Sequence, residues 1–301
     1  MNRNIKKIFL HTLFLLCVIT TFFLMSCSTI ASATSGLGGI SPTIDAVNKS
    51  ATAIDKASED FTPENEYYIG RAVGANILEK YNPYTSDRSL ILYLNKICRA
   101  ITVNSPMPEL YNGYYVMILD SDEIIAFATS GGHIFITRGL LACTDSEDSL
   151  AAVVAHEVAH IQLQHNIKAI KASRTTQAVM VTGTSVVSVA GQGTELGKLA
   201  SLFGEDVNKA VTSVVNSGYS QSQEFDADNL AMSLMASAGY EPSSLVSMLK
   251  LLAQNQPKNA GGFGKTHPSP EKRIKNAEGK LKAYKVEDTR EYRQKRFQSV
   301  K

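Results

Sequence analysis

The sequence predicts an α+β fold that is mainly helical. Much of the chain after residue 60 has apolar residues at helical spacing, and several of these stretches begin with good capping residues. Only three short stretches read as strands, so the expected β-sheet is small. The length of 301 residues, 44% of them hydrophobic, lies at the upper end for one core, and we expect one globular domain.

Two helices are expected before the sheet. Thr62, Pro63 and Glu64 form a helix start, with the threonine as the cap and the proline in the first turn. This helix should end near Lys80, where the sequence Tyr-Asn-Pro-Tyr interrupts it. A second helix should run over 87–103.

Strand-like stretches follow at 114–119, 124–128 and 133–137. Gly131 and Gly132 predict a turn between the second stretch and the third. An apolar helix should then start near Asp145 or Ser146, since either side chain can cap it.

This apolar helix carries the sequence His-Glu-Val-Ala-His at 156–160. Residues four apart share one helix face, so His156 and His160 can both turn a ring nitrogen toward one metal ion. Glu157 can then reach a water molecule at that metal. The bare string arises by chance in about one chain in a hundred of this size. Buried histidines and a buried glutamate are costly without polar partners, however, so the apolar context favours a metal site.

A peptidase zinc site needs a third protein ligand. A glycine and a third histidine on the same stretch are absent, because Leu163 and Asn166 occupy those places, and His165 should point off the ligand face. Glu224 and Asp228 stand four apart on another predicted helix. Glu224 would complete a His-His-Glu set, and Asp228 could accept the second ring N–H of a histidine. The alternative is a solvated acidic face near a helix start.

The two helices together resemble those of the gluzincin metallopeptidases of the HtpX, BepA and LoiP type. In these, His-Glu-x-x-His, here at 156–160, is followed by Glu-x-x-Ala-Asp, here at 224–228. Residues 126–141 resemble the glycine turn and edge strand of that family, and residues 266–274 resemble its late His-Pro segment. The resemblance extends from about Phe61 to about Lys285, with the motifs in the family's order.

The resemblance implies a zincin-type domain with a small β-sheet whose edge strand precedes the His-Glu-x-x-His helix. It implies one zinc ion held by His156, His160 and Glu224, with Glu157 as the general base. Peptide substrate would pair with the edge strand, which is expected at Gly132, His133, Ile134, Phe135 and Ile136.

Further residues carry expectations from the same resemblance. His267, just before a helix that should start at Ser269, would approach the metal as an inhibitory ligand. Apart from the resemblance, the expected zinc mechanism would have His267 or Arg273 help neutralise the developing oxyanion. Ser130 and Ile125 depart from the family, which often has proline and asparagine there, and both changes concern the substrate strand. The chain is too short for the helical-repeat region of BepA-like proteins, and it looks closer to the LoiP-like members.

The N-terminus predicts an envelope lipoprotein. Basic residues precede an apolar stretch over 8–25, which is the plan of a secretory signal. Leu24-Met25-Ser26-Cys27 resembles a bacterial lipobox, which implies cleavage before Cys27 and attachment of lipid to it. Ser28 then favours the outer membrane, facing the periplasm. The alternative is an uncleaved anchor, because the stretch is just long enough to span a bilayer.

The expected layout is a signal peptide over 1–26, a flexible tether over 27–60, a zinc metallopeptidase domain over 61–285 and a basic charged tail over 286–301. The net charge is +2, but residues 271–301 alone carry +6. This basic end could touch anionic lipid or a partner, or be a solvated helix. No nucleic-acid motif accompanies it, and no nucleic-acid partner is expected.

Two features stay open at this level. Cys98 and Cys143 could form a disulfide in an oxidising envelope, or behave as small hydrophobic residues. Residues 167–215 could be a mobile helical insertion over the active site, or plain core helices.

The expected function is that of a membrane-tethered zinc metalloendopeptidase that acts on unfolded or misassembled envelope proteins. One alternative is a non-catalytic or latent zinc-bound chaperone or assembly factor at the outer membrane. It would be favoured if His267 closed the fourth zinc position. A second alternative is an exopeptidase, for which no cluster that would grip a chain terminus is apparent.

Overall fold

The computed structural model describes residues 60–180, 218–255, 266–267 and 270–300. The predicted signal peptide, the lipidation site Cys27 and nearly all of the predicted tether lie outside these residues. Most of the insertion expected at 167–215 lies outside them as well.

The chain divides into two compact units. The larger unit consists of residues 60–174 and 188–301, and it holds every element discussed below except the C-terminal end of the helix over 165–180. Of the smaller unit, residues 1–59 and 175–187, only 175–180 are described, and they are helical. Among the described residues, no helix is both long enough and apolar enough to cross a membrane.

The two helices predicted before the sheet are confirmed. Helix α4 (Pro63–Lys80) begins with a capping box, in which Thr62 Oγ1 accepts from the backbone N–H of Asn65 at 3.1 Å. Helix α5 (Arg88–Val103) begins after Asp87, whose carboxylate accepts from the N–H of Leu90 at 2.9 Å. Both starts follow from local capping chemistry, which is why the sequence alone could place them.

The sheet has three strands, β1 (Tyr115–Leu119), β2 (Ala126–Ala128) and β3 (His133–Thr137), in the order β1-β3-β2. β3 pairs with β2 in antiparallel fashion and with β1 in parallel fashion. The expected edge strand at 132–136 is therefore wrong, because β3 is the central strand. Gly131, with φ of +75°, turns β3 back beside β2 and leaves β2 as an edge.

The outer edge of β1 is closed by side-chain and backbone hydrogen bonds. Asn95 Nδ2 donates to the carbonyl of Val116, and the N–H of Val116 donates to Asn95 Oδ1, both at 2.9 Å. The N–H of Tyr84 donates to the carbonyl of Ile118 at 2.8 Å. These bonds occupy the groups that another strand would need, so β1 is protected from strand addition.

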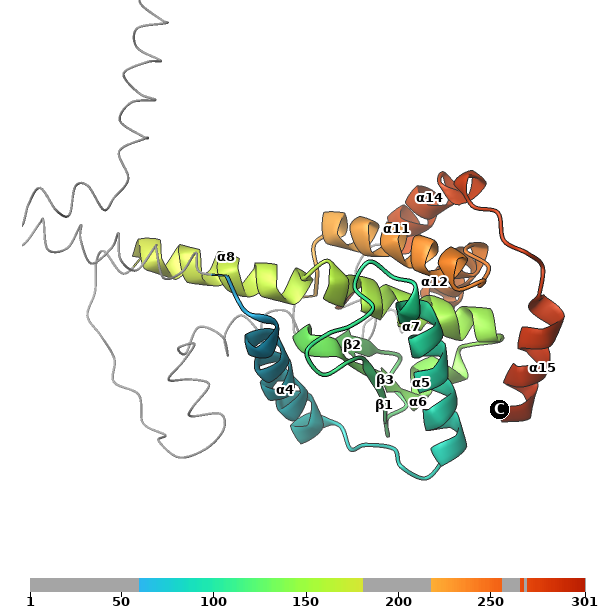
Figure 1. Ribbon diagram of the computed structural model, residues 1–301, viewed down its shortest axis with the longest axis horizontal. Coiled ribbons are helices and arrows are strands. Elements are labelled where there is room, and N and C mark those ends of the chain that lie inside the picture. The colour runs from blue at the N-terminus through green and yellow to red at the C-terminus, as the bar shows by residue number, and fades with distance from the viewer. Residues whose placement is uncertain (1–59, 181–217, 256–265, 268–269, 301) are drawn as a thin grey trace, which may run out of the picture. The chain divides into compact units, whose positions relative to one another are not determined.

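Two hydrophobic clusters lie on opposite faces of the sheet. Figure 1 shows the sheet with the surrounding helices. Side chains alternate along β2, so Ala126 and Ala128 pack toward the larger cluster, and Phe127 toward the smaller one. The larger cluster includes α5, α7 (Glu147–Gln162), α11 (Gln221–Ser237) and α12 (Ser243–Asn255), while the smaller one includes α4 and the start of α8 (His165–Met180).

The remaining helical elements are η1 (Ser130–Gly132), α6 (Arg138–Ala142), α14 (Pro270–Glu278), η2 (Leu281–Ala283) and α15 (Arg290–Val300). A mainly helical fold with a small sheet is thus confirmed.

The predicted basic tail at 286–301 is packed against the domain. Helix α15 buries Phe297 and Arg293, which are 7% and 4% exposed. Arg293 Nε donates to Asp148 Oδ2 at 2.8 Å, in the first turn of α7. The sequence showed the positive charges of this segment, but not the buried carboxylate that one of them meets.

Cys98 and Cys143 are not joined by a disulfide. Cys98 is buried in the larger cluster, and Cys143 Sγ donates to the carbonyl of Gly139 at 3.4 Å. The expectation of a small hydrophobic role for Cys98 therefore holds.

Candidate metal centre

Helix α7 presents the two predicted histidine ligands. It starts at the predicted cap, Ser146, whose hydroxyl accepts from the N–H of Ser149 at 3.1 Å. His156 Nε2 and His160 Nε2 lie 3.1 Å apart, and their rings are 2% and 0% exposed. Because the helix is buried on nearly every face, these ring nitrogens point at each other inside the protein rather than at solvent.

Helix α11 brings Glu224 to the same point. Ser220 caps this helix, which places Glu224 in its first turn. Glu224 Oε2 lies 3.5 Å from His156 Nε2, and Glu224 Oε1 lies 3.5 Å from His160 Nε2. One ligand atom from each of His156, His160, Glu224 and His267 lies within 4.8 Å of all the others.

This donor set fits a zinc ion. Imidazole nitrogens and a carboxylate oxygen are ordinary zinc ligands, and their lone pairs converge here on one buried point. Glu157 is fully buried, and neither of its carboxylate oxygens has a hydrogen-bond partner among the described residues. A buried carboxylate without hydrogen bonds is costly unless a cation or a reactant meets it, so its position also suits a metal centre.

Asp228 lies where it can orient a ligand. Its Oδ1 is 3.1 Å from His156 Nδ1, so it can accept the proton of the nitrogen that does not face the cluster. Burial alone would raise the pKa of Asp228, but Arg273 outweighs this effect and holds that pKa below its usual value. Asp228 is therefore a carboxylate, as an acceptor for the imidazole N–H must be.

Arg273 contacts the carboxylates of the centre. Its Nε and Nη2 donate to the two oxygens of Asp228 at 2.8 and 2.7 Å, and its Nη1 lies 2.9 Å from Glu224 Oε2. The side chain is 1% exposed. These contacts tie α14 to two carboxylates of α11; the role expected for Arg273 at the oxyanion stays a prediction.

His267 lies inside the cluster. Its Nδ1 is 3.2 Å from His156 Nε2 and 3.0 Å from Glu224 Oε1, and its Nε2 is 3.6 Å from Glu157 Oε1. The expectation that the segment before α14 bends over the metal ligands thus agrees with its position. As a fourth ligand at this distance, the His267 nitrogen could close the open position that a catalytic zinc requires.

Two further rings lie beside His160, that of His165, which was expected to point off the ligand face, and that of Tyr219, which was not expected there. His165 Nδ1 lies 2.9 Å from His160 Nδ1, although a continuous helix would turn His165 away. Helix α7 ends at Gln162 and Gln164 has a φ of +54°, so the chain changes direction before His165. The ring of Tyr219 stacks on that of His160 at 3.9 Å between centroids. Tyr219 precedes the predicted ligand helix, but nothing in its local sequence marks it.

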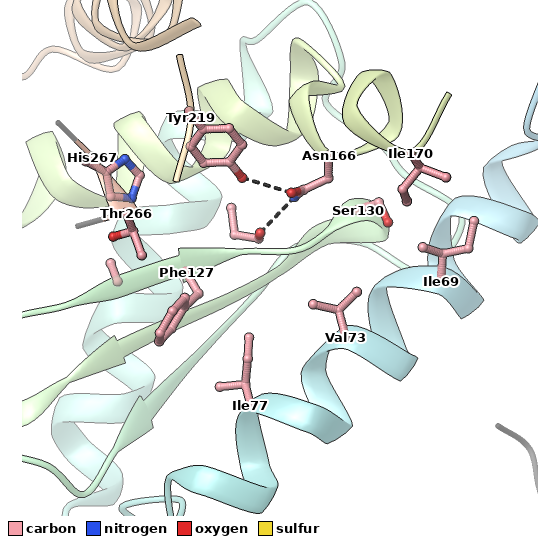
Figure 2. A pocket seen from close by; sticks show the side chains of 12 residues that line it. Ile69, Val73, Ile77, Phe127, Ser130, Asn166, Ile170, Tyr219, Thr266 and His267 are labelled. Atoms are coloured by element: carbon pink, nitrogen blue, oxygen red, sulfur yellow. Dashed lines mark hydrogen bonds between the residues drawn. The ribbon is translucent and has the colours of Figure 1, made fainter. Parts of the chain in front are cut away.

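The open edge of β2 lies next to this centre. Thr129 and Ile125 bond to β3, so the alternating residues Ala126 and Ala128 direct their backbone groups to the other side. Asn166 Nδ2 donates to the carbonyl of Ala128 at 2.8 Å, and Tyr219 donates to Asn166 Oδ1 at 3.0 Å. Figure 2 shows this chain of bonds above β2, in a pocket that His267 also lines.

Comparison with known proteins identifies the family. A sequence model described as peptidase family M48 matches residues 92–281, which is more than half of the chain. The chain belongs to peptidase family M48. The matched region of this M48 protein contains every proposed zinc ligand. The predicted class, a zinc metallopeptidase of the HtpX, BepA and LoiP type, is confirmed by this membership.

Three relatives illustrate the similarity. The mitochondrial metalloendopeptidase OMA1 of Schizosaccharomyces pombe is 28% identical over 68% of this chain and 55% of its own length. The beta-barrel assembly-enhancing protease of Escherichia coli is 25% identical over 70% of this chain and 42% of its own length. Metalloprotease LoiP of Escherichia coli is 28% identical over 62% of this chain and 70% of its own length. The M48 chain thus spans about half of the first two relatives.

Proposed function

We propose that this M48 protein is a membrane-tethered zinc metalloendopeptidase of the bacterial envelope that hydrolyses unfolded or misassembled envelope proteins. The main support is the convergence of His156, His160 and Glu224 on one buried point, beside Glu157 and an open strand edge. The names of the similar enterobacterial proteins, a beta-barrel assembly-enhancing protease and a metalloprotease, support the class of substrate.

Each side chain has a separate role in the proposed mechanism. His156, His160 and Glu224 hold the zinc ion, which supplies Lewis-acid polarisation of the scissile carbonyl and activation of water when bound. Glu157 accepts the proton of the attacking water and then donates it to the leaving amine. Burial raises the pKa of Glu157, which suits a group that must hold this proton between the two transfers. Asp228 orients His156.

We propose that the substrate pairs with β2 in place of the strand first expected. The N–H and carbonyl of Ala126 point away from β3, and the opposite edge of the sheet is closed by Asn95. A peptide that adds to β2 is read through its backbone, so an extended, unfolded chain is preferred over a particular sequence. Peptides N-methylated at single positions test this pairing, because one methyl group should lower kcat/KM without changing any side chain.

Membrane attachment and compartment rest on the N-terminal sequence. We propose that cleavage before Cys27 and its lipidation tether the domain at the outer membrane, with 27–60 as the spacer. Cys27→Ser should leave the uncleaved precursor, which intact-mass measurement of the purified protein detects directly. If Cys27→Ser instead gave a mature protein of the same mass as the wild type, this part of the proposal would be contradicted.

A latent zinc-bound assembly factor is the second candidate, and the position of His267 favours it. With His267 Nδ1 3.2 Å from His156 Nε2, the open zinc position could be filled from within the chain. In this form the protein would not hydrolyse peptides until His267 moved away.

One experiment separates the two candidates. The full-length protein, its Glu157→Gln variant and its His267→Ala variant are incubated with an unfolded protein, and the zinc content of each is measured. Cleavage by the wild type but not by zinc-loaded Glu157→Gln would support the endopeptidase. Cleavage by His267→Ala alone would support latency. Cleavage by Glu157→Gln at the wild-type rate would contradict the proposed mechanism.

A further inference from the structure

A largely apolar pocket opens between β2, α4 and α8, beside the metal centre. Ile69, Val73 and Ile77 of α4 form one wall, Phe127 forms the floor, and Ile170 lies opposite (Figure 2). The pocket reaches His267 at its other end. Helix α4 lies outside residues 92–281, so the matched family region does not contain this wall.

The wall formed by α4 is held in place by close backbone packing. A Cβ at Gly70 would lie 1.7 Å from the carbonyl oxygen of Ser130, so only glycine allows α4 to approach η1 this closely. Ser130 Oγ also donates to the carbonyl of Glu66 at 2.9 Å. The wall formed by α4 is therefore fixed in position beside the open edge of β2.

Only one residue of a peptide paired with β2 would direct its side chain into this pocket. In paired strands, directly opposite side chains point to the same face of the sheet. Phe127 points toward α4, while Ala126 and Ala128 point toward α7. In a peptide paired with β2, the residue opposite Phe127 would thus direct its side chain to the α4 face, where this pocket lies.

We infer that this pocket is the main specificity subsite of the peptidase, and that it takes a large apolar side chain such as leucine or phenylalanine. Val73 and Ile77 set its depth. The inference rests on the proposed pairing of substrate with β2. Ile69, Val73 and Ile77 offer a peptide side chain only apolar contacts, so a charged side chain against this wall would lose part of its hydration. Burial of a leucine or phenylalanine here should favour it over alanine by about 10- to 100-fold.

The test uses peptides that differ at one position, containing alanine, leucine or tryptophan. Cleavage is measured with the full-length, zinc-loaded protein and its His267→Ala variant, and binding is measured by fluorescence anisotropy with Glu157→Gln. Val73→Phe fills the pocket and should reduce the preference for leucine over alanine to within about threefold. Ile77→Ala enlarges the pocket and should shift the preference toward tryptophan. Val103→Phe makes the same change at an exposed position of α5 and should alter neither the preference for leucine nor that for tryptophan.

The outcomes distinguish this inference from the proposed function. An apolar preference in binding without any cleavage would support the pocket and count against the peptidase proposal. Cleavage without an apolar preference at any position would overturn the inference and leave the peptidase proposal standing. Equal binding of all the peptides would mean that another part of the chain fills the pocket, and would also overturn the inference. Ile77→Ala keeps the test decisive if Val73→Phe does not fold.

Discussion

Arg273 holds both carboxylate oxygens of Asp228 through Nε at 2.8 Å and Nη2 at 2.7 Å, and this pair lies directly beside His156. The two residues are 45 positions apart and belong to α14 and α11. The geometry is the planar, two-point contact that lysine cannot reproduce. It joins the last helix of the matched family region to the orientation of a zinc ligand.

Asp228→Asn should weaken zinc binding by about 10- to 100-fold, because the acceptor for the imidazole N–H of His156 becomes a neutral amide. Competition with a chelator of known affinity measures this change. Glu241→Gln serves as the control, since Glu241 lies away from the cluster that could hold the metal. An unchanged zinc affinity in Asp228→Asn would show that Asp228 does not orient His156.

Arg293→Ala should destabilise the domain by about 3–5 kcal/mol, because it leaves the buried carboxylate of Asp148 unpaired. Arg290→Ala is the matched control on the same helix. Its partner Asp288 is well exposed, so the free energy of unfolding should change little. Denaturant unfolding of the zinc-loaded protein gives both values. Equal effects of the two variants would mean that α15 is not anchored through Arg293.

Gly131→Ala should cost more stability than Gly239→Ala. Both glycines have positive φ, of 75° and 80°, so both variants carry a strain of about 1–2 kcal/mol. Only at Gly131 would the new Cβ clash, at 2.3 Å from the Cα of Tyr67, whereas Gly239 has open space. The difference in unfolding free energy should be at least about 2 kcal/mol, since backbone cannot move aside as a side chain can. A smaller difference would show that α4 can shift away from η1.

Cys98 should resist alkylation in the folded protein at pH 8. Burial raises its pKa to about 12, and the thiolate is the reactive form. Peptide mapping after iodoacetamide treatment, with and without denaturant, measures its modification alone. Rapid labelling of Cys98 in the folded protein would contradict the buried position.

The same shift predicts a dependence of stability on pH. The unfolded thiol has a pKa near 9.0 and loses its proton first, so the folded state loses stability as the pH rises from 9 toward 12. Cys98→Ala removes this contribution, and its unfolding free energy should fall less steeply over that range. If the unfolding free energies of the two proteins fell equally steeply with pH, the raised pKa of Cys98 would be refuted.

Local signals predicted the elements of the site well. Ser146 and Thr62 act as caps in the structure, as their sequence positions indicated. The spacing of His156 and His160 placed both rings on one face of α7. Capping and helical periodicity depend on residues a few positions apart, so the sequence contains them in readable form.

Contacts between distant segments could not be predicted in the same way. The local sequence predicted that residues 133–137 form a strand. The position of this strand in the sheet, however, depends on its parallel pairing with β1, from which a long connection separates it in the chain. Tyr219 was missed because its stacking on His160 leaves no pattern in the local sequence. The contact of His165 with His160 was not expected because a continuous helix would turn His165 away.

The sequence by itself determined that one helix has two histidines on one face and a glutamate beside them, because these features depend on spacing within a single helix. Its resemblance to a known family added Glu224, on another helix, as the third ligand. Only the tertiary structure decided that β2 is the open edge, that Arg273 pairs with Asp228 and that Arg293 anchors α15. Such choices depend on which buried charge or strand edge finds a partner, and that is decided when the whole core packs.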